Sequence, residues 1–306
     1  MKKNQLSVVI SVFNGEKELD DCLRSVSFAD EIVIVNNSST DKTEDVGRKY
    51  TDKIFTRPNN PMLNVNKNFG FSKATGDWIL CLDADERVTP ELRDEIKNQI
   101  SNLKDKADGY WILRKNIIFG KWIEHTGWYP DHQLRLFRNG KGKFPEKHVH
   151  EMVKVSGETS HLKNNLLHYN YITVSQFLNK LNIYVANEAE QLIRNGYTFK
   201  WQDAIRFPVK EFLSRFFARE GYKDGLHGLV LSLLMAFYHL LIFATIWEKK
   251  GFEKVEHKNF FSEVEDELEK SSKDIFFWLD SEKIKLIKNP FKKVVYKTIR
   301  KIRTKN

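Results

Sequence analysis

The chain contains few of the residues that mark cross-linked, repetitive or linker-rich proteins. Its 306 residues include 2 cysteines and 7 prolines. Cys22 is expected on a helix face and Cys81 in a buried strand, so the two do not resemble a disulfide framework. We find no internal repeat, low-complexity tract or proline-rich linker. The length allows one large domain, or one domain with an extension, with ample capacity to form a core.

The N-terminal residues are not expected to form an apolar leader. The first apolar stretch, residues 6–13, is short and dense in β-branched side chains, and it ends at the turn signal Asn14-Gly15. This composition predicts a strand of a sheet rather than a signal sequence. We therefore expect a cytoplasmic protein.

Strands and helices are predicted to alternate from this strand onward. Three later segments have the apolar character of strands: 31–35, 53–55 and 78–82. Helical patterns separate them at 18–26, from Asp41 onward, and at 64–73. Asp41 and Glu44 resemble a capping box at the start of the second helix. The order β-α-β-α-β-α-β predicts an α/β fold, with a doubly wound sheet and right-handed crossovers.

Two acidic residues, Asp83 and Asp85, follow the last of these strands and form the most informative motif of the chain. Ligands of open α/β sheets bind beyond the carboxyl ends of the strands. Since residues i and i+2 of an extended segment point the same way, both carboxylates are expected to face one site. A divalent cation holding a phosphorylated substrate would stabilise the pair. The alternative is a solvated acidic loop that opens a helix at Thr89-Pro90-Glu91.

Several separated motifs carry a resemblance to a known family. They are Ser7–Asn14, Ser39–Asp41, Asn68–Glu86, Gly127–Asp131, Gln133–Arg138 and Val149–Glu151. In this order they resemble glycosyltransferase family 2, and the last three are similar to the branch that includes lipopolysaccharide-core glucosyltransferases. The resemblance covers about residues 5 to 250. It implies a GT-A nucleotide-sugar fold with a mixed sheet, a divalent metal (Mn²⁺ or Mg²⁺) and inversion at the anomeric carbon.

The chemistry of sugar transfer suggests roles for the acidic residues. The leaving diphosphate has to be neutralised, which a metal held by Asp85 would do, with Asp83 nearer the ribose or a metal-bound water. The acceptor hydroxyl has to lose its proton to a base, for which Asp131, after Tyr129-Pro130, is the candidate. A capping role for Asp131 at a turn or strand is the alternative. Glu86 is the nearest competing base.

One histidine is a candidate third metal ligand. His168 lies where related enzymes can place such a ligand, and imidazole suits manganese-like ions better than calcium-like ones. Because two leucines precede it, His168 is equally well interpreted as a hydrogen-bonded core residue.

The donor-binding residues are expected at the same rim of the sheet. They are Asn14, Asn36, Asn37, Asp41, Asn68 and Asp83. In many members of the family an acidic residue after the second strand binds the uracil imide. This chain has Asn36-Asn37 at that place. An amide both donates and accepts, but it loses the charge-assisted bond, so a UDP-linked donor is still expected. Asp41 would contact the ribose or only cap its helix.

Four further residues are candidates for contacts with the acceptor or the diphosphate. They are Trp128, Arg135, His150 and Glu151. Trp128 would stack on a sugar ring, or else serve in packing. Arg135 and Arg138 alternate poorly along a strand, so one of the two is expected to face the site.

Beyond residue 172 the pattern becomes helical. Segments 176–194 and 204–219 have helical periodicity, with Phe177, Leu181, Tyr184 and Val185 on one face. Residues 229–247 carry no Asp, Glu, Lys or Arg, and as a helix they would span about 28 Å, close to the thickness of bilayer hydrocarbon. We favour a helix that packs on the catalytic domain or lies in the membrane interface over a single spanning helix.

The basicity of the chain is concentrated near its end. Residues 283–305 contain ten Lys or Arg and no acid, whereas the whole chain has a net charge of +9. Apolar residues interleave with these basic ones, which suits anionic lipid headgroups. Nucleic acid is the competing partner, but no nucleic-acid-binding signature accompanies the tail.

The sequence therefore divides into three parts: a GT-A catalytic domain (1–172), a helical region that packs on that domain or on the membrane (173–250), and a charged linker with a basic amphipathic tail (251–306). The predicted function is sugar transfer from a nucleotide-sugar to a cell-envelope saccharide or lipid-linked acceptor, at the inner face of the cytoplasmic membrane. Two alternatives stay open. A sugar-phosphate nucleotidyltransferase would need a Gly-rich phosphate loop after the first strand, and this chain has no such loop there. A non-catalytic membrane-binding module would need neither Asp85 nor Asp131.

Overall fold

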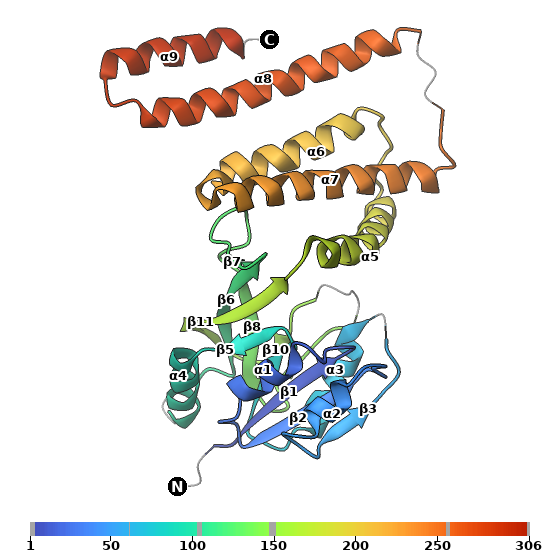
Figure 1. The fold of residues 1–306 in the computed structure, drawn as a ribbon, viewed down its shortest axis with the longest axis vertical. Coiled ribbons are helices and arrows are strands. Elements are labelled where there is room, and N and C mark those ends of the chain that lie inside the picture. Colours follow the sequence, from blue (N-terminus) through green and yellow to red (C-terminus); the bar gives the residue numbers. More distant parts are fainter. Residues whose placement is uncertain (1–3, 61, 103–105, 147–150, 255–257, 305–306) are drawn as a thin grey trace. The chain divides into compact units, whose positions relative to one another are not determined.

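The computed structural model describes residues 4–60, 62–102, 106–146, 151–254 and 258–304 (Figure 1). The chain forms two compact units. The first contains the chain up to Ile118 together with Tyr129–Asn170, and the second contains Phe119–Trp128 together with the chain from Tyr171 onward. The division into three parts at residues 172 and 250 stays a prediction.

Parallel strands form one half of the sheet in the first unit. They are β1 (Leu6–Val12), β2 (Glu31–Asn36), β3 (Ile54–Thr56) and β4 (Trp78–Leu82). Their order is β3-β2-β1-β4, and each neighbouring pair is parallel. The loops that follow β1, β2 and β4 therefore lie at one rim of the sheet, where ligands of such folds bind. The predicted β-α-β alternation is confirmed.

Antiparallel strands extend the sheet beyond β4. In spatial order they are β8 (His132–Arg138), β6 (Gly109–Ile118), β11 (Thr159–Tyr171) and β5 (Glu86–Val88). The pairings β4–β8, β8–β6 and β11–β5 are antiparallel. A separate ribbon pairs β9 (Gly142–Lys143) with β10 (Lys154–Val155). The sheet is thus mixed, and the predicted GT-A fold class is confirmed.

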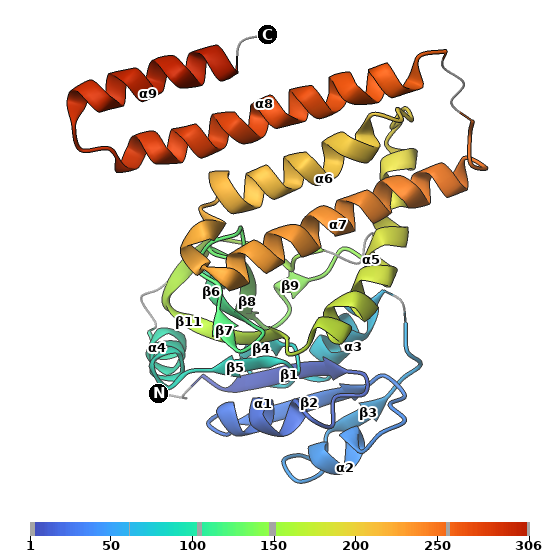
Figure 2. The same ribbon diagram turned by 45° about the horizontal axis from the view of Figure 1, so that its top comes forward.

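Helices cover both faces of this sheet (Figure 2). The helices of the first unit are α1 (Leu19–Ser25), α2 (Thr43–Gly47), α3 (Leu63–Lys73) and α4 (Pro90–Ser101). Alternate residues of β1 point into two separate cores, because Val8 packs in a cluster with residues of α1 and α4 while Val9 packs in one with residues of α3. Gly70 of α3 allows this second approach, since a Cβ there would lie 2.5 Å from Val9 Cγ1. Two-sided burial explains why the parallel strands are continuous apolar runs.

The helix after β2 begins differently from the prediction. α2 has Lys42 at its N-cap, and Glu44 contacts Asn36 and Arg48 instead of capping the turn. Asp41 accepts hydrogen bonds from the backbone N–H groups of Thr43 and Glu16, at 3.0 and 3.1 Å. The predicted capping box is therefore wrong, although Asp41 does hold the start of the helix.

Helices dominate the second unit. They are α5 (Val174–Arg194), α6 (Asp203–Leu213), α7 (Leu226–Lys249), α8 (Phe260–Leu286) and α9 (Pro290–Arg303), with the short strand β7 (Lys121–Trp122) earlier in the chain. The predicted helix 204–219 changes at Ser214 into a π-helical segment, Ser214–Ala218. α5 buries Phe177, Leu181 and Val185, as predicted.

α7 is the described helix that is long and apolar enough to cross a membrane, by length and composition alone. It packs against α5 and α6, and residues such as Leu231 and Ile246 are fully buried. Leu233, Phe237 and Leu240 are exposed, and 33% of the most apolar 18-residue window is buried. One face of α7 is therefore packed and the other is uncovered within this unit.

The basic tail is divided between two helices rather than continuous. Asn289 caps α9 by accepting a hydrogen bond from the Lys292 N–H at 3.2 Å, and Pro290 follows in the first turn. A proline at this position starts a helix but cannot continue the preceding one. α9 then folds back on α8, because Arg300 donates to Ser281 Oγ at 2.8 Å and Arg303 lies 3.5 Å from Asp280.

Asp224 ties segment 119–128 to the helices of the second unit. Its buried carboxylate accepts hydrogen bonds from the His125 N–H at 2.9 Å, the Glu124 N–H at 3.3 Å and Thr126 Oγ1 at 3.0 Å. Lys121 Nζ donates to the Asp224 carbonyl oxygen at 2.7 Å. One side chain thus satisfies several donors from a segment far away in the sequence.

Replacement of this carboxylate should destabilise the second unit. In Asp224→Ala the three donors lose their acceptor, and we expect the free energy of unfolding to fall by about 2–5 kcal/mol. Urea titration followed by circular dichroism measures this change. Asp224→Asn keeps one acceptor oxygen and should lose less. An Asp224→Ala protein with the wild-type unfolding midpoint and slope would contradict the assignment.

Candidate active site

The acidic loop after β4 is held by positive charges from the protein itself. Asp83 accepts hydrogen bonds from Lys67 Nζ at Oδ1 and from Arg135 Nη2 at Oδ2, both at 2.5 Å. Burial alone would raise the pKa of Asp83, but the charges of Arg135 and Lys67 hold this pKa well below its usual value. Asp83 therefore stays ionised.

Glu86 occupies the centre of this cluster and is fully buried. Its Oε1 accepts from Arg135 Nη2 at 2.7 Å and from Arg114 Nη1 at 3.1 Å, and its Oε2 accepts from the Asp83 N–H at 2.9 Å. A buried carboxylate is stable when its charge is paired and its lone pairs are hydrogen-bonded, as they are here. These contacts fit a structural partner of the site rather than a base open to a substrate.

Asp131 lies on the same network, just before β8. Its Oδ2 accepts from Arg114 Nε at 2.8 Å and from Asn116 Nδ2 at 3.1 Å, and its Oδ1 accepts from Gln133 Nε2 at 2.8 Å. Burial raises the pKa of Asp131, but the charge of Arg114 and the hydrogen bonds from Gln133, Asn116 and Arg114 outweigh burial and lower the pKa below its usual value. The side chain is ionised and remains 22% exposed.

Asp85, directly before β5, and His168, within β11, face each other. His168 Nε2 lies 3.5 Å from Asp85 Oδ2. The pairing of β11 with β5 creates this proximity, because it places His168 opposite Glu86 and the Tyr169 N–H donates to the Asp85 carbonyl at 2.9 Å. On its other side, His168 Nδ1 lies 2.7 Å from Asn116 Oδ1. The predicted ligands Asp85 and His168 are thus brought together.

The chemistry of this pair suits a divalent metal. A carboxylate oxygen with an imidazole nitrogen is a donor set that binds manganese-like ions. No group of three or more His, Cys, Asp and Glu side chains within the described ranges has the geometry of a metal site. The oxygens of a diphosphate are the natural source of further ligands for such an ion. Asp85 and His168 therefore fit as part of the ligand set of a divalent metal.

Three residues of this network are not among those predicted from the sequence: Lys67 on α3, and Arg114 and Asn116 on β6. The last two carry a signal that the sequence does contain. They are polar residues two apart in a strand, so they point to the same face. That face is identified only when the antiparallel order β8-β6-β11 is known.

The predicted donor-binding asparagines hold the rim loops together. Asn14 Oδ1 accepts from the Thr40 N–H at 2.8 Å, and Asn36 Oδ1 accepts from the Ser39 N–H at 2.9 Å. Asn37 is buried and accepts at Oδ1 from Asn66 Nδ2 at 2.8 Å. These side chains shape the loops after β1 and β2 through backbone and side-chain contacts.

The other predicted site residues that the structure describes have different partners. Asn68 donates to the Phe144 carbonyl at 2.9 Å, and Glu151 accepts from Asn64 Nδ2 at 3.5 Å. Trp128 belongs to the second unit, where its ring contacts Tyr171 edge to face. His150 lies outside the described residues.

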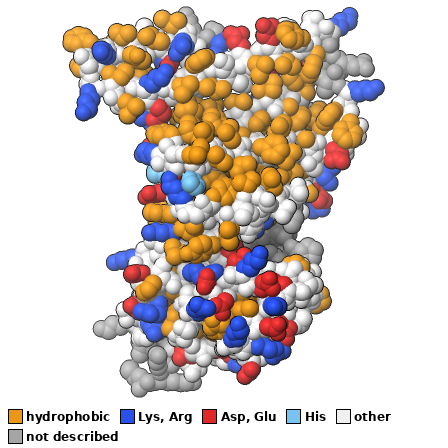
Figure 3. All heavy atoms as spheres, viewed as in Figure 1, with side chains coloured by type: hydrophobic (Ala, Val, Ile, Leu, Met, Phe, Trp, Pro, Cys, Tyr) orange, Lys and Arg blue, Asp and Glu red, His pale blue; other side chains and the backbone are white. Residues whose placement is uncertain are grey.

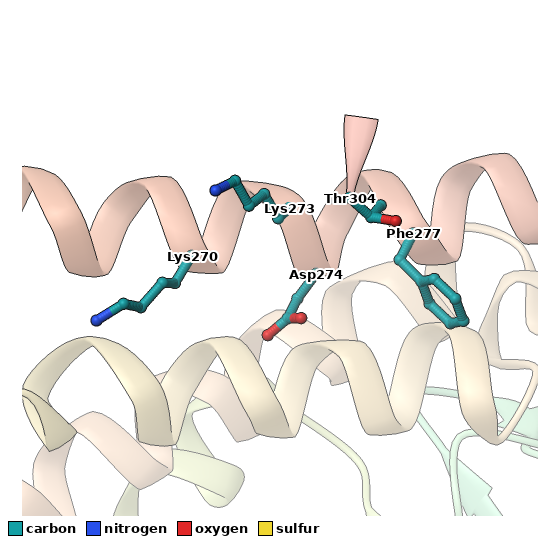
Figure 4. A pocket seen from close by; sticks show the side chains of 5 residues that line it. All are labelled: Lys270, Lys273, Asp274, Phe277 and Thr304. Atoms are coloured by element: carbon teal, nitrogen blue, oxygen red, sulfur yellow. The ribbon is translucent and has the colours of Figure 1, made fainter. Parts of the chain in front are cut away.

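A pocket of about 480 Å³ in the second unit has a different lining. Figure 4 shows the side chains around it: Lys270, Lys273, Asp274, Phe277 and Thr304. None of the residues discussed above as sugar-transfer candidates lines this pocket. The carboxylate network of the first unit is therefore the candidate active site.

The chain resembles known glycosyltransferases in sequence. Residues 7–154 match the family described as Glycosyl transferase family 2, a stretch that includes Asp83, Asp85 and Asp131. Residues 7–154 form a family 2 glycosyltransferase domain. This match favours a sugar-transferring enzyme. It argues against the two alternatives that the sequence left open, a nucleotidyltransferase and a non-catalytic module.

Relatives of the glycosyltransferase resemble it over most of its length. LpsC of Rhizobium meliloti (strain 1021), a lipopolysaccharide core biosynthesis glycosyltransferase, is 27% identical over 254 residues, covering 81% of this chain and 93% of LpsC. A glycosyltransferase of Rickettsia typhi is 28% identical over 261 residues, covering 81% of this chain and 88% of its own. The predicted similarity to the lipopolysaccharide-core branch is confirmed.

One of the solved structures that match this one is the mannosyltransferase PcManGT of Pyrobaculum calidifontis, in complex with GDP-Man and Mn²⁺. It has a TM-score of 0.46 at 13% sequence identity and covers 99% of this chain and 85% of its own.

The lowered pKa of Asp131 predicts a pH dependence of stability. A carboxyl whose folded pKa lies below its unfolded value stabilises the fold above the unfolded pKa and loses this contribution as the pH falls through the folded pKa. The stability difference between wild type and Asp131→Asn should therefore be largest near neutral pH. It should shrink as the pH falls below about 4, the unfolded pKa of an aspartate. Urea unfolding from pH 7 to pH 3 measures it, and a constant difference over this range would contradict the assignment.

Proposed function

We propose that this glycosyltransferase is metal-dependent and inverting, and that it moves a sugar from a UDP-linked donor to a cell-envelope saccharide or lipid-linked acceptor such as lipopolysaccharide core. One observation supports this proposal most. Asp85 and His168 face each other at 3.5 Å, and Asn116 connects His168 to the ionised carboxylate of Asp131. Candidate metal ligands and a candidate base are thereby joined in one network.

In the proposed reaction Asp85 and His168 would hold the metal beside the donor diphosphate. When bound, the ion would act as a Lewis acid and neutralise charge developing on the leaving diphosphate. Asp83 is engaged by Lys67 and Arg135, so we assign it to positioning the loop and contacting the donor. This division gives the two acids at the end of β4 different roles.

Asp131 would accept the proton of the acceptor hydroxyl. Arg114 and Asn116 both hold its Oδ2, which orients the other oxygen, Oδ1. Its lowered pKa keeps it ionised and makes it a weak base. Proton transfer to such a base accompanies formation of the new glycosidic bond rather than preceding it. Inversion follows if the hydroxyl attacks from the sugar face opposite the diphosphate.

Different observations support the proposed donor and the proposed acceptor. The rim loops after β1 and β2, shaped by Asn14, Asn36 and Asn37, are the proposed binding place of the uridine. LpsC, similar over 81% of this chain, is named for lipopolysaccharide core biosynthesis, which supports an envelope saccharide as acceptor. A panel of UDP- and GDP-sugars, screened for Mn²⁺-dependent thermal stabilisation, tests the nucleotide.

A membrane surface is the proposed site of action. α9 carries basic residues at 292, 293, 297, 300, 301 and 303 and no acid, and its apolar residues Phe291, Val294 and Ile302 are exposed. Figure 3 shows further apolar side chains gathered over the helices of the second unit. An amphipathic basic helix of this kind binds anionic lipid through both charge and apolar burial. We therefore propose a peripheral enzyme on the inner face of the cytoplasmic membrane.

Two substitutions should separate the metal ligand from the base. Asp85→Ala should weaken binding of Mn²⁺ with UDP and abolish transfer, because the diphosphate loses its neutralising cation. Asp131→Asn should keep metal and nucleotide binding while transfer falls by about 10²–10⁴, the usual loss for a general base. Calorimetry with UDP and Mn²⁺, beside initial rates of transfer, measures both. Full activity of Asp85→Ala, or of wild type in excess chelator, would refute the metal site; near-normal turnover of Asp131→Asn would remove it as the base.

Loss of charge on α9 should weaken membrane binding. In the triple variant Lys292→Gln, Lys297→Gln and Lys301→Gln, we expect affinity for anionic vesicles to fall at least tenfold, since each basic residue contributes about 1 kcal/mol. Vesicle sedimentation at two salt concentrations measures it, and wild-type binding should itself fall as salt rises.

The matched control removes the same charge from the first unit, at Lys49, Lys106 and Lys141, all of them exposed. It should leave binding nearly unchanged. Equal losses in the two triple variants would show that net charge, and not α9, drives the association.

A further inference from the structure

Asn116 lies between Asp131 and His168, although it is itself neither a candidate metal ligand nor a candidate base. It lies on β6 with 1% of its surface exposed. Its Nδ2 is 3.1 Å from Asp131 Oδ2, and its Oδ1 is 2.7 Å from His168 Nδ1. One amide thus contacts both the candidate base and the candidate metal ligand.

The charge of Asp131 determines which way this amide points. An ionised carboxylate can only accept hydrogen bonds, and only the nitrogen of an amide can donate. Arg114 and Gln133 donate to the same carboxylate and keep it ionised. Asn116 Nδ2 therefore faces Asp131, because the flipped amide would set two oxygens against each other.

The orientation of the amide in turn determines the tautomer of His168. The amide oxygen of Asn116 can only accept, so His168 Nδ1 has to carry the hydrogen at 2.7 Å. In a neutral imidazole the hydrogen then leaves Nε2 with a free lone pair. Nε2 is the atom that faces Asp85 Oδ2 at 3.5 Å. In this tautomer a cation bound between the two atoms would accept an electron pair from each of them.

We propose that Asn116 is a positioning residue that couples the two halves of the active site: it fixes the Nδ1–H tautomer of His168 for metal binding, and it orients Asp131 toward the acceptor. The inference rests on the proposed function of His168 and Asp131. Hydrogen-bond partners of metal-ligating histidines fix the ring and its tautomer, and their loss weakens metal affinity about 10–100-fold. Asn116 differs from a simple partner because its other end holds the candidate base.

Two substitutions divide the two hydrogen bonds of Asn116. Asn116→Leu has nearly the same size and removes both. Asn116→Asp keeps an oxygen that accepts from His168 Nδ1 but replaces the donor to Asp131 by a second acceptor. Asn164 offers a matched control, since it lies on β11 with His168 and also donates to a carboxylate, Glu95, at 2.9 Å.

The test measures Mn²⁺ affinity in the presence of UDP by calorimetry, and separately the rate of transfer. We expect Asn116→Leu to bind Mn²⁺ about 10–100-fold more weakly than wild type. Asn116→Asp should bind Mn²⁺ far better than Asn116→Leu, while its turnover falls toward that of Asp131→Asn. Asn164→Leu should match wild type in metal affinity. Circular dichroism of each variant identifies any that has not folded.

Each other outcome has a definite meaning. If His168→Ala binds Mn²⁺ like wild type, the proposed metal site itself is wrong. If His168→Ala binds weakly but folded Asn116→Leu binds like wild type, the role of Asn116 toward His168 is refuted. Equal metal affinities of Asn116→Asp and Asn116→Leu, or wild-type turnover of Asn116→Asp, would likewise overturn the proposed coupling.

Discussion

Charge balance beneath the loop after β4 is the constraint on which the site depends. Seven charged side chains belong to the network described above: the carboxylates of Asp83, Asp85, Glu86 and Asp131, and the cations of Lys67, Arg114 and Arg135. Their formal charges leave an excess of one negative charge. Buried charges are stable only when paired and hydrogen-bonded, so the arrangement is close to balanced before any substrate binds. A divalent metal with a nucleoside diphosphate adds little net charge to it.

Parts of this site follow directly from the sequence. The continuous apolar run 78–82 identifies a buried strand, and Asp83 and Asp85 follow at its carboxyl end, where the structure places them. Such local patterns predict the parallel half of the sheet because its strands alternate with helices along the chain. The burial of Glu86 among Arg114 and Arg135 has a different origin. It depends on which distant strands become neighbours, and a period of two residues within one strand carries no information about that order.

The distinction between local sequence patterns and long-range contacts also explains where the other predictions differ from the structure. The sequence of the tail does contain its break, since Asn289-Pro290 is a start signal for a new helix. The change from α6 to a π-helical segment at Ser214 has no comparable mark in the sequence. Segment 119–128 joins the second unit through the carboxylate of Asp224, about a hundred residues away, and tertiary contacts at that separation leave no periodic signal in either segment. Function follows a similar division, with the proposed chemistry in the first unit and the proposed lipid-binding helix in the second.

Asp85 and His168 are proposed to bind one metal ion together with the donor. Pulsed electron paramagnetic resonance of Mn²⁺ bound to the full-length protein with UDP tests this proposal most directly, because a coordinated imidazole nitrogen modulates the electron spin echo. We expect this nitrogen modulation in the wild-type protein and in Asp131→Asn, and its loss in His168→Ala. A wild-type complex without nitrogen modulation, or its persistence in His168→Ala, would contradict the account.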